Sequence, residues 1–499
     1  MRILGLTFGW KPKENVIYRT HNSIREGIVG QKVYVTTRVV NRAVKIIISG
    51  KALPGSFSVS KGICTIIVKS GREHKLLTPV SNVKFDKKVI SSCNSGQNQY
   101  GTRFSYPIVS ITYTAKVVDA NKIRDPIEEL SGYSNLEIMK KLFKEDIIKS
   151  KEPSFIYETK PKIKLTRFSK IEGMLLGIAI GDSLGNTTES MMPKERRQKY
   201  GLITDYLPNK HAHKERKGLP SDDTQLAFDT LGVILDKGKL DMEELARVFS
   251  SHRVFGIGKT VKEFLRNYKD YGKPWYLSGV VDGAGNGALM RIAPVLVSSL
   301  ANQTENLYAD TVLATMLTHN SALAIGSSVA LTDMLCRFVS SEEKPNPETV
   351  IKEFTEVLGS FTENTKSSIR NAKLRSKFSN SAPVFIRQAI DYGYNSEMNV
   401  EQFSDYFYSG AYVLETNALV LYILSKYLKD PKEAIIQAVN YSKDNDTVAS
   451  IIGATVGALY GKAAFKESWI TGLSGKTRED DDGKIFEMIC ETKEFLNIG

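Results

Sequence analysis

A long apolar segment, SKIEGMLLGIAIGDSLG, runs from Ser169 to Gly185. Its four glycines recur at every fourth position, at Gly173, Gly177, Gly181 and Gly185. Each glycine inside a helix costs about 1 kcal/mol relative to alanine, so their regular spacing needs a reason. We expect them to let a second helix pack closely, and the same spacing recurs at Gly453, Gly457 and Gly461. Two such helices crossing closely would bring their polar ends together.

The start of the first glycine helix also has a recognisable signal. Ser169 and Glu172 have the spacing of a capping box and stand just before the apolar run, which predicts that the helix begins at Ser169. From residue 166 onward the pattern is that of long helices with little strand. The sequence therefore predicts an all-α C-terminal domain.

Two short polar clusters stand at predicted helix starts. One reads SDDT, from Ser221 to Thr224, and the other reads DNDT, from Asp444 to Thr447. Either cluster alone is commonly only a helix cap. Together with Glu189, and without nearby cysteine, they indicate an all-oxygen site for hard divalent cations. Five carboxylates at one place would repel one another, and two divalent ions would balance most of that charge.

A third block, GAGNGALMR from Gly283 to Arg291, is rich in glycine. Residues without a Cβ atom let backbone N–H groups approach a diphosphate closely. A glycine-rich turn before a helix is, however, often only a turn. His319 presents the same choice, since a lone histidine can be a core or capping residue.

Charge divides the chain into two parts. The net charge is +13, and residues 1–165 contain 29 Lys plus Arg against 13 Asp plus Glu, whereas the rest contains 39 against 42. Alternating apolar residues at 32–40, 43–49, 62–69 and 109–117 predict strands. We therefore predict a basic, β-rich (α+β) domain at 1–150 with a helical segment near its end, a linker at 151–165 and the all-α domain at 166–499.

Several protein classes are excluded by composition. The chain has 499 residues, 41% of them hydrophobic, so a fibrous or wholly disordered protein is excluded. No CxxC pair occurs among the four cysteines, which argues against a disulfide framework or a zinc site. No apolar run reaches eighteen residues, and the first thirty lack a signal-peptide core. We expect a cytoplasmic protein that does not enter the membrane.

Four blocks together resemble the ADP-ribosylglycohydrolase family, which includes the dinitrogenase reductase-activating glycohydrolases. They are Gly181–Gly185 with Glu189, Ser221–Thr224, Gly285–Arg291 and Asp444–Thr447, in the family's order over about residues 168–470. The resemblance implies an all-α hydrolase with two Mg²⁺ or Mn²⁺ ions, which cleaves the bond between C1″ of ADP-ribose and an acceptor.

By position, the resemblance assigns roles to individual residues. It implies metal ligands at Ser221, Asp222, Asp223, Asp444, Asp446 and Thr447. It implies catalytic carboxylates among Glu189, Asp222, Asp223 and Asp446. It implies ligand-binding residues at Gly285, Asn286, Gly287, Met290 and His319. The family usually has Thr where this chain has Ser221 and Asn445; Ser221 keeps the hydroxyl, and Asn445 lies between ligands.

The acceptor is left open by the sequence. The first hypothesis is a hydrolase acting on an ADP-ribosylated protein, linked through arginine or serine, with the N-terminal domain choosing the target. The second is a protein that binds ADP-ribosylated targets or sterically blocks an ADP-ribosyltransferase partner. The third is a hydrolase directed at nucleic acid through the basic domain.

The N-terminal part has a weaker resemblance of its own. Arg19, Ser58 with Ser60, and Gln97 with Gln99 are spaced like the motifs of an arginine-type ADP-ribosyltransferase. Glutamines stand where such a transferase needs glutamates, so the resemblance implies a degenerate, inactive fold.

Overall fold

The computed structural model contains two compact units, Met1–Ser131 and Gly132–Gly499. It describes side chains at residue 130 and in residues 132–157, 165–209, 217–269, 273–301, 306–363 and 369–497. Before residue 118 it describes only the backbone of strands.

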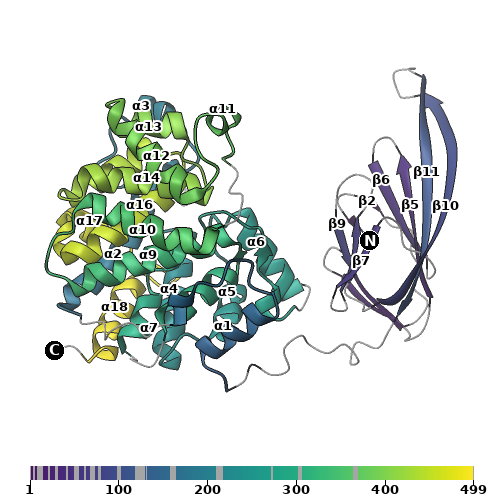
Figure 1. Ribbon diagram of the computed structural model, residues 1–499, viewed down its shortest axis with the longest axis horizontal. Helices are drawn as coiled ribbons and strands as arrows, with labels where there is room; N and C mark the ends of the chain where they lie inside the picture. The colour runs from purple at the N-terminus through teal and green to yellow at the C-terminus, as the bar shows by residue number, and fades with distance from the viewer. Residues whose placement is uncertain are drawn as a thin grey trace. The chain divides into compact units, whose positions relative to one another are not determined.

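The strands of the N-terminal unit pair in antiparallel fashion, and four of them form one sheet in the order β10-β11-β5-β6 (Figure 1). Their bounds are β1 Arg2–Ile3, β2 Leu6–Thr7, β3 Asn15–Thr20, β4 Ser23–Gly27, β5 Lys32–Val40, β6 Ala43–Ser49, β7 Ser56–Ser60, β8 Ile63–Ile67, β9 Glu73–Leu76, β10 Val80–Gln97 and β11 Arg103–Val117. The domain class assigned to residues 1–150 stays a prediction. The side chains of the transferase-like motif, from Arg19 to Gln99, lie outside the described residues.

The C-terminal unit is helical, which confirms the all-α prediction. Its α-helices are α1 Asn135–Lys144, α2 Phe168–Gly185, α3 Pro193–Tyr200, α4 Asp222–Lys237, α5 Met242–Ser251, α6 Lys259–Leu265, α7 Val295–Ala301, α8 Leu307–Met316, α9 Ala322–Ser340, α10 Pro347–Thr362, α11 Ala372–Arg375, α12 Ala382–Asn395, α13 Val400–Phe407, α14 Val413–Tyr427, α15 Pro431–Tyr441, α16 Asn445–Tyr460, α17 Glu467–Thr471 and α18 Lys484–Phe495. Short 3-10 helices are η2 Ser154–Tyr157, η3 Asn186–Thr188, η5 Trp275–Leu277, η6 Leu289–Arg291 and η7 Gly461–Ala464, and η4 Arg266–Asp270 is a short π-helix. Two short strands, β12 Val280–Val281 and β13 His319–Asn320, pair in parallel.

The C-terminal unit begins at Gly132, earlier than the boundary predicted from the sequence. Asn135 on α1 donates hydrogen bonds to Asp310 Oδ1 at 2.6 Å and to the Leu240 carbonyl at 2.8 Å. The ring of Phe155 packs edge-on against Tyr308. The helix near the end of the first predicted domain and the start of the predicted linker therefore pack on this unit, because buried polar and aromatic groups anchor them.

Helices α2 and α16 pack backbone against backbone. An added Cβ at Gly177 would lie 2.1 Å from the Gly453 carbonyl oxygen, and one at Gly181 would lie 2.2 Å from the Ala449 carbonyl oxygen. One at Gly185 would lie 2.5 Å from the Asp446 Cα. The C-terminal end of α2 therefore meets the N-terminal end of α16, as the glycine spacing predicts, and the polar ends of the helices come together.

The predicted capping box at the start of α2 is wrong. The helix begins at Phe168 after Arg167, and Arg167 makes no side-chain capping bond. Glu172 pairs with Lys462 Nζ at 3.1 Å instead. Residue Ser169 lies inside the first turn, where its side chain is past the N-cap position.

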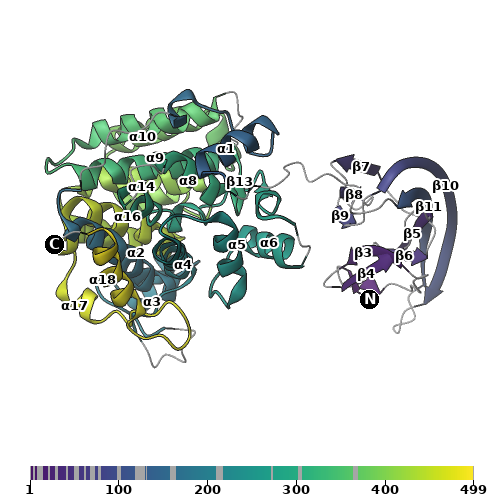
Figure 2. The same cartoon turned by 90° about the horizontal axis from the view of Figure 1, so that it is seen from below.

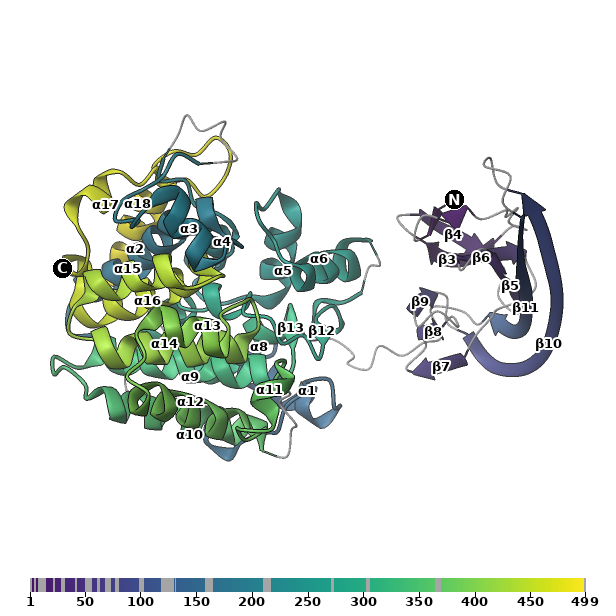
Figure 3. The ribbon, with the colours of Figure 1, turned by 90° about the horizontal axis from the view of Figure 1, so that it is seen from above.

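The remaining helices cover this central pair on both sides. Figure 2 shows α10, α9, α16, α2 and α18 following one another across the unit, and Figure 3 shows the same order from the opposite side. Helix α9 and the segment Asn445–Ala464 are long and apolar enough to cross a membrane. However, 94% of the apolar stretch in α9 and 83% of that in the second segment are buried inside the unit. They are the core helices of the C-terminal unit.

Candidate active site

An acidic cluster lies where α2, α4 and α16 meet. One carboxylate oxygen each from Asp182, Asp223 and Asp446 lie within 4.8 Å of one another, and the same holds for Glu189, Asp444 and Asp446. Glu189 follows η3, directly after α2. Segments more than two hundred residues apart in sequence thus supply one group of carboxylates, as the sequence predicted.

The capping alternative fails for both polar clusters. Ser221 is the N-cap residue of α4, but its side chain makes no capping bond to that helix. Its hydroxyl donates to Asp182 Oδ1 at 2.7 Å. Asp444 is the N-cap residue of α16 and likewise makes no side-chain capping bond; its Oδ2 accepts from Asn286 Nδ2 at 2.6 Å. Both side chains are directed into the cluster.

Asp182 is a carboxylate of the cluster to which the sequence analysis assigned no role. Its side chain is fully buried. It accepts hydrogen bonds from Ser221 N at 2.6 Å, Ser221 Oγ at 2.7 Å, Thr224 N at 3.2 Å, Thr224 Oγ1 at 2.6 Å and Asn186 Nδ2 at 2.9 Å. Because both of its oxygens are occupied, Asp182 holds the start of α4 in position. The signal for it was an acid next to the helix-packing Gly181.

Asp223 differs from Asp182 in its hydrogen bonding. Its Oδ1 is buried and has no hydrogen-bond partner in the part of the chain that the structure describes. Burial raises the pKa of each aspartate in the cluster, and neighbouring carboxylates raise the pKa values of Asp222, Asp223 and Asp446 further. An unpaired buried oxygen among mutually repelling carboxylates fits a hard divalent cation.

A buried arginine joins the two halves of the cluster. Arg196 on α3 donates to Thr188 Oγ1 at 2.9 Å, beside Glu189, and to the Ser442 carbonyl at 2.7 Å, beside Asp444. Asn445 Nδ2 donates to the same Thr188 hydroxyl at 3.0 Å. Asn445, which stands where the family usually has Thr, therefore links the start of α16 to the segment before Glu189. Nothing in the sequence around Arg196 indicated this role.

The glycine block lies beside the carboxylates. Its backbone pairs with residues 411–413, through Asn286 N to the Ala411 carbonyl at 3.0 Å and Val413 N to the Ala284 carbonyl at 3.0 Å. The side chain of Asn286 positions Asp444, and Thr447 Oγ1 lies 3.8 Å from Met290 Sδ. These contacts bring the glycine block against Asp444 and Thr447 of the second polar cluster. Its role in binding a diphosphate stays a prediction.

The ring of His319 packs against the glycine block. A Cβ added at Gly285 would lie 3.2 Å from His319 Nε2, and one at Gly287 would lie 3.1 Å from its Cε1. Thr318 Oγ1 accepts from Arg291 Nη2 at 2.9 Å and lies 2.8 Å from His319 Nδ1. Because the guanidinium can only donate, the hydroxyl proton is available to Nδ1, which favours a neutral ring protonated at Nε2. Burial, with Arg291 nearby, lowers the pKa of His319 to about 3.

The C-terminal unit is a helical domain whose acidic cluster lies at a glycine-mediated helix crossing. Residues 164–493 match the ADP-ribosylglycohydrolase family. The chain belongs to this family, and it is an enzyme that removes ADP-ribose.

Curated relatives agree with this assignment. ADP-ribosylarginine hydrolase Tri1 of Serratia proteamaculans is 25% identical over 325 residues, which cover 62% of this chain and 76% of that protein. The ADP-ribosyl-[dinitrogen reductase] glycohydrolase of Rhodospirillum rubrum is 24% identical over 314 residues, covering 62% of this chain and 91% of that protein. The ADP-ribosylhydrolase ARH3 of Homo sapiens is 23% identical and covers 62% of this chain and 91% of that protein.

Proposed function

We propose that this protein is a metal-dependent hydrolase that cleaves the C1″ bond between ADP-ribose and the side chain of a modified protein. The observation that carries the proposal is the convergence of Glu189 and the aspartates at one buried place, with Asp223 Oδ1 left without a hydrogen-bond partner there. Two Mg²⁺ or Mn²⁺ ions would be held by Ser221, Asp222, Asp223, Asp444, Asp446 and Thr447. Bound ions of this kind supply Lewis acidity and lower the pKa of a bound water.

The chain's own residues would then carry out the proton transfer. Glu189 accepts a proton from the water whose oxygen forms the new bond to C1″. The bond from C1″ to the acceptor breaks, its electron pair stays with the acceptor atom, and that atom takes up the proton that Glu189 accepted. Asp182 keeps the start of α4 in place during this step, through its bonds to Ser221 and Thr224.

The test is release of free ADP-ribose from arginine-linked, serine-linked and nucleic-acid-linked substrates. Each would be measured with and without Mg²⁺ or Mn²⁺, for the wild type and for Asp222→Ala/Asp223→Ala. We expect metal-dependent release from a protein-linked substrate that the double variant loses. Binding of ADP-ribose without release from any linkage would instead support a binding or steric inhibitory protein, and release from nucleic acid alone would support the third hypothesis.

We also propose that the N-terminal part selects the target in the cytoplasm. Residues 1–165 carry 29 Lys plus Arg against 13 Asp plus Glu, and a basic surface favours acidic partners. Removing residues 1–131 should leave hydrolysis of a small ADP-ribosylated compound unchanged and slow that of the modified protein. Equal rates on both substrates would contradict target selection.

A further inference from the structure

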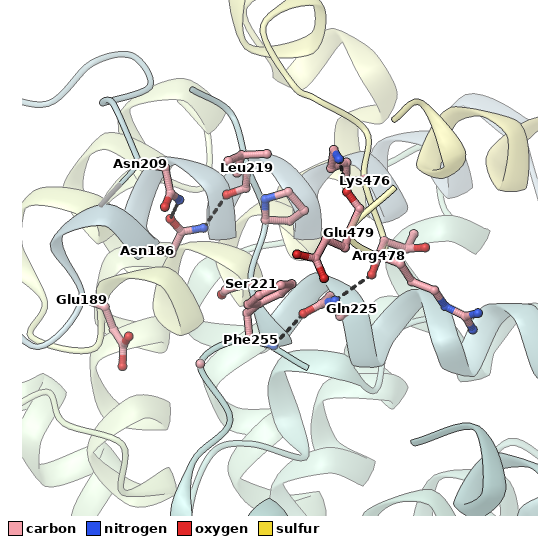
Figure 4. Close-up of a pocket in the computed structure, with 13 residues that line it drawn as sticks. Asn186, Glu189, Asn209, Leu219, Ser221, Gln225, Phe255, Lys476, Arg478 and Glu479 are labelled. Atoms are coloured by element: carbon pink, nitrogen blue, oxygen red, sulfur yellow. Dashed lines mark hydrogen bonds between the residues drawn. The ribbon is translucent and has the colours of Figure 1, made fainter. Parts of the chain in front are cut away.

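A cavity adjoins the acidic cluster at the start of α4. A pocket of about 350 Å³ is lined by Ser221, Glu189 and Gln225, by Phe255, and by the loop at residues 476–479 (Figure 4). Within the described residues, neither the glycine block nor His319 is part of its lining. The pocket therefore reaches the carboxylates from a different direction than the predicted phosphate cradle.

The loop that forms the far wall is held in place. Gln225, a buried residue on α4, donates to the Thr477 carbonyl at 2.8 Å and accepts from Phe255 N at 2.8 Å. The carboxylate of Asp481 accepts from Thr477 N at 3.0 Å and from Arg478 N at 2.6 Å. These bonds fix the loop backbone next to the start of α4, so the pocket has a built wall.

The charged side chains of this loop point in different directions. Figure 4 shows the carboxylate of Glu479 directed toward Ser221 and Gln225, and the guanidinium of Arg478 directed away from them. Arg478 Nη2 faces Asp229 Oδ1 at 3.8 Å. Lys476 Nζ bonds to the Glu479 carbonyl and lies 3.6 Å from Asp482 Oδ2. The Glu479 carboxylate is thus directed toward the start of α4, whereas the Lys476 and Arg478 side chains, which also line the pocket, face oxygen atoms of other residues.

We propose that this pocket receives the acceptor side chain from which ADP-ribose is released, and that Glu479 selects a positively charged acceptor, the guanidinium of arginine. The inference rests on the proposed function, because C1″ would lie at the acidic cluster and the rest of ADP-ribose on the glycine side. The acceptor must then leave on the remaining side. A carboxylate pairs with a planar guanidinium through two parallel hydrogen bonds.

The experiment compares two linkages on the full-length, metal-loaded enzyme. Glu479→Gln removes the charge and keeps the shape, so kcat/KM for ADP-ribosylarginine should fall about tenfold, as expected for a lost charge-assisted hydrogen bond. The fall should lie in KM, and the rate on an ADP-ribosylserine peptide should not change. The matched control is Glu494→Gln, an exposed glutamate on α18 that does not line the pocket; it should change neither rate.

Three outcomes would overturn the proposal: no change with Glu479→Gln, an equal loss on both linkages, or a wild type that cleaves serine-linked but not arginine-linked ADP-ribose. A wild type that releases ADP-ribose from no linkage would instead refute the proposed function. Titration with free ADP-ribose separates the two sides of the cluster, because Glu479→Gln should leave its affinity unchanged.

Discussion

The two sides of the carboxylate cluster are held in place by different kinds of hydrogen bond. On the glycine side, main-chain bonds fix the loop, such as Asn286 N to the Ala411 carbonyl at 3.0 Å, and His319 packs directly against Gly285 and Gly287. On the pocket side, a single buried side chain, Gln225, holds two surface loops at 2.8 Å each. Main-chain bonds hold the loop on the glycine side, whereas a buried side chain holds the loops on the pocket side.

This difference suggests that the two sides of the cluster bind different parts of the substrate. A wall built from backbone and glycine tolerates few substitutions, because any added atom meets its neighbours, and it suits the part of the substrate that never varies. A wall built from side chains on loops can change without moving the scaffold, and it suits the acceptor. On the proposed function, the first wall would bind ADP-ribose and the second would choose the linkage.

The largest effect should come from the cluster between the walls. Asp223→Asn should lower kcat by more than about 100-fold, since loss of a metal ligand exceeds the 10–100-fold typical of groups that only orient ligands. The variant should unfold at the same or a higher temperature than the wild type in EDTA, because a neutral amide replaces a buried carboxylate that its neighbours repel. Activity assays and thermal unfolding with EDTA or Mn²⁺ measure both. Activity within tenfold of the wild type would exclude Asp223 as a ligand.

Asp182→Asn tests positioning without removing a ligand. The substitution replaces one acceptor oxygen with a donor and disturbs the bonds to Ser221 and Thr224. We expect kcat to fall about 10–100-fold on every linkage, because both sides of the cluster depend on the start of α4. Asp391→Asn, an exposed aspartate on α12, is the control. A loss confined to one linkage would show that Asp182 acts on the acceptor side only.

Gly285→Ala should disturb packing on the glycine side of the cluster and leave the pocket side unchanged. The new methyl group would lie 3.2 Å from His319 Nε2. ADP-ribose affinity should weaken about tenfold, since overpacking of this size costs about 1–3 kcal/mol, and arginine and serine linkages should suffer equally. Gly359→Ala on α10 places its methyl 3.5 Å from Pro383 Cγ, an ordinary contact, and should leave titration curves unchanged. If Gly285→Ala left the affinity for ADP-ribose unchanged, the predicted role of the glycine block in binding the diphosphate would be contradicted.

The smallest effect should come from loosening the pocket side. Gln225→Leu removes the bonds to Thr477 and Phe255 and should reduce the preference between arginine and serine linkages about fivefold, the equivalent of about 1 kcal/mol for a hydrogen bond. Affinity for free ADP-ribose should stay the same. Competition assays with both substrates measure the preference, and Gln437→Leu on α15 serves as the control. A loss of ADP-ribose binding would show that the two walls are not independent.

Much of the site could be predicted because its residues are grouped in sequence. The SDDT and DNDT clusters and the glycine spacing carry the chemistry and the helix contact in short segments, and the helix crossing at Gly181 and Gly185 confirms the expectation. Arg196 could not be predicted, because its partners at Thr188 and Ser442 lie on other segments. The capping box at Ser169 failed because residue spacing does not reveal where the first helical turn begins.

Local periodicity and residue types at short spacing specify the all-α class of the C-terminal unit, the helix pair, and the carboxylates of Glu189 and the two polar clusters. Packing, in contrast, fixes that both oxygens of Asp182 are hydrogen-bonded and that, among the described residues, Asp223 Oδ1 has no hydrogen-bond partner. Packing also directs the Glu479 carboxylate toward Ser221 and Gln225 and the Arg478 guanidinium away from them. The physical reason is that hydrogen-bond partners and side-chain directions depend on segments brought together by packing, which no local pattern specifies.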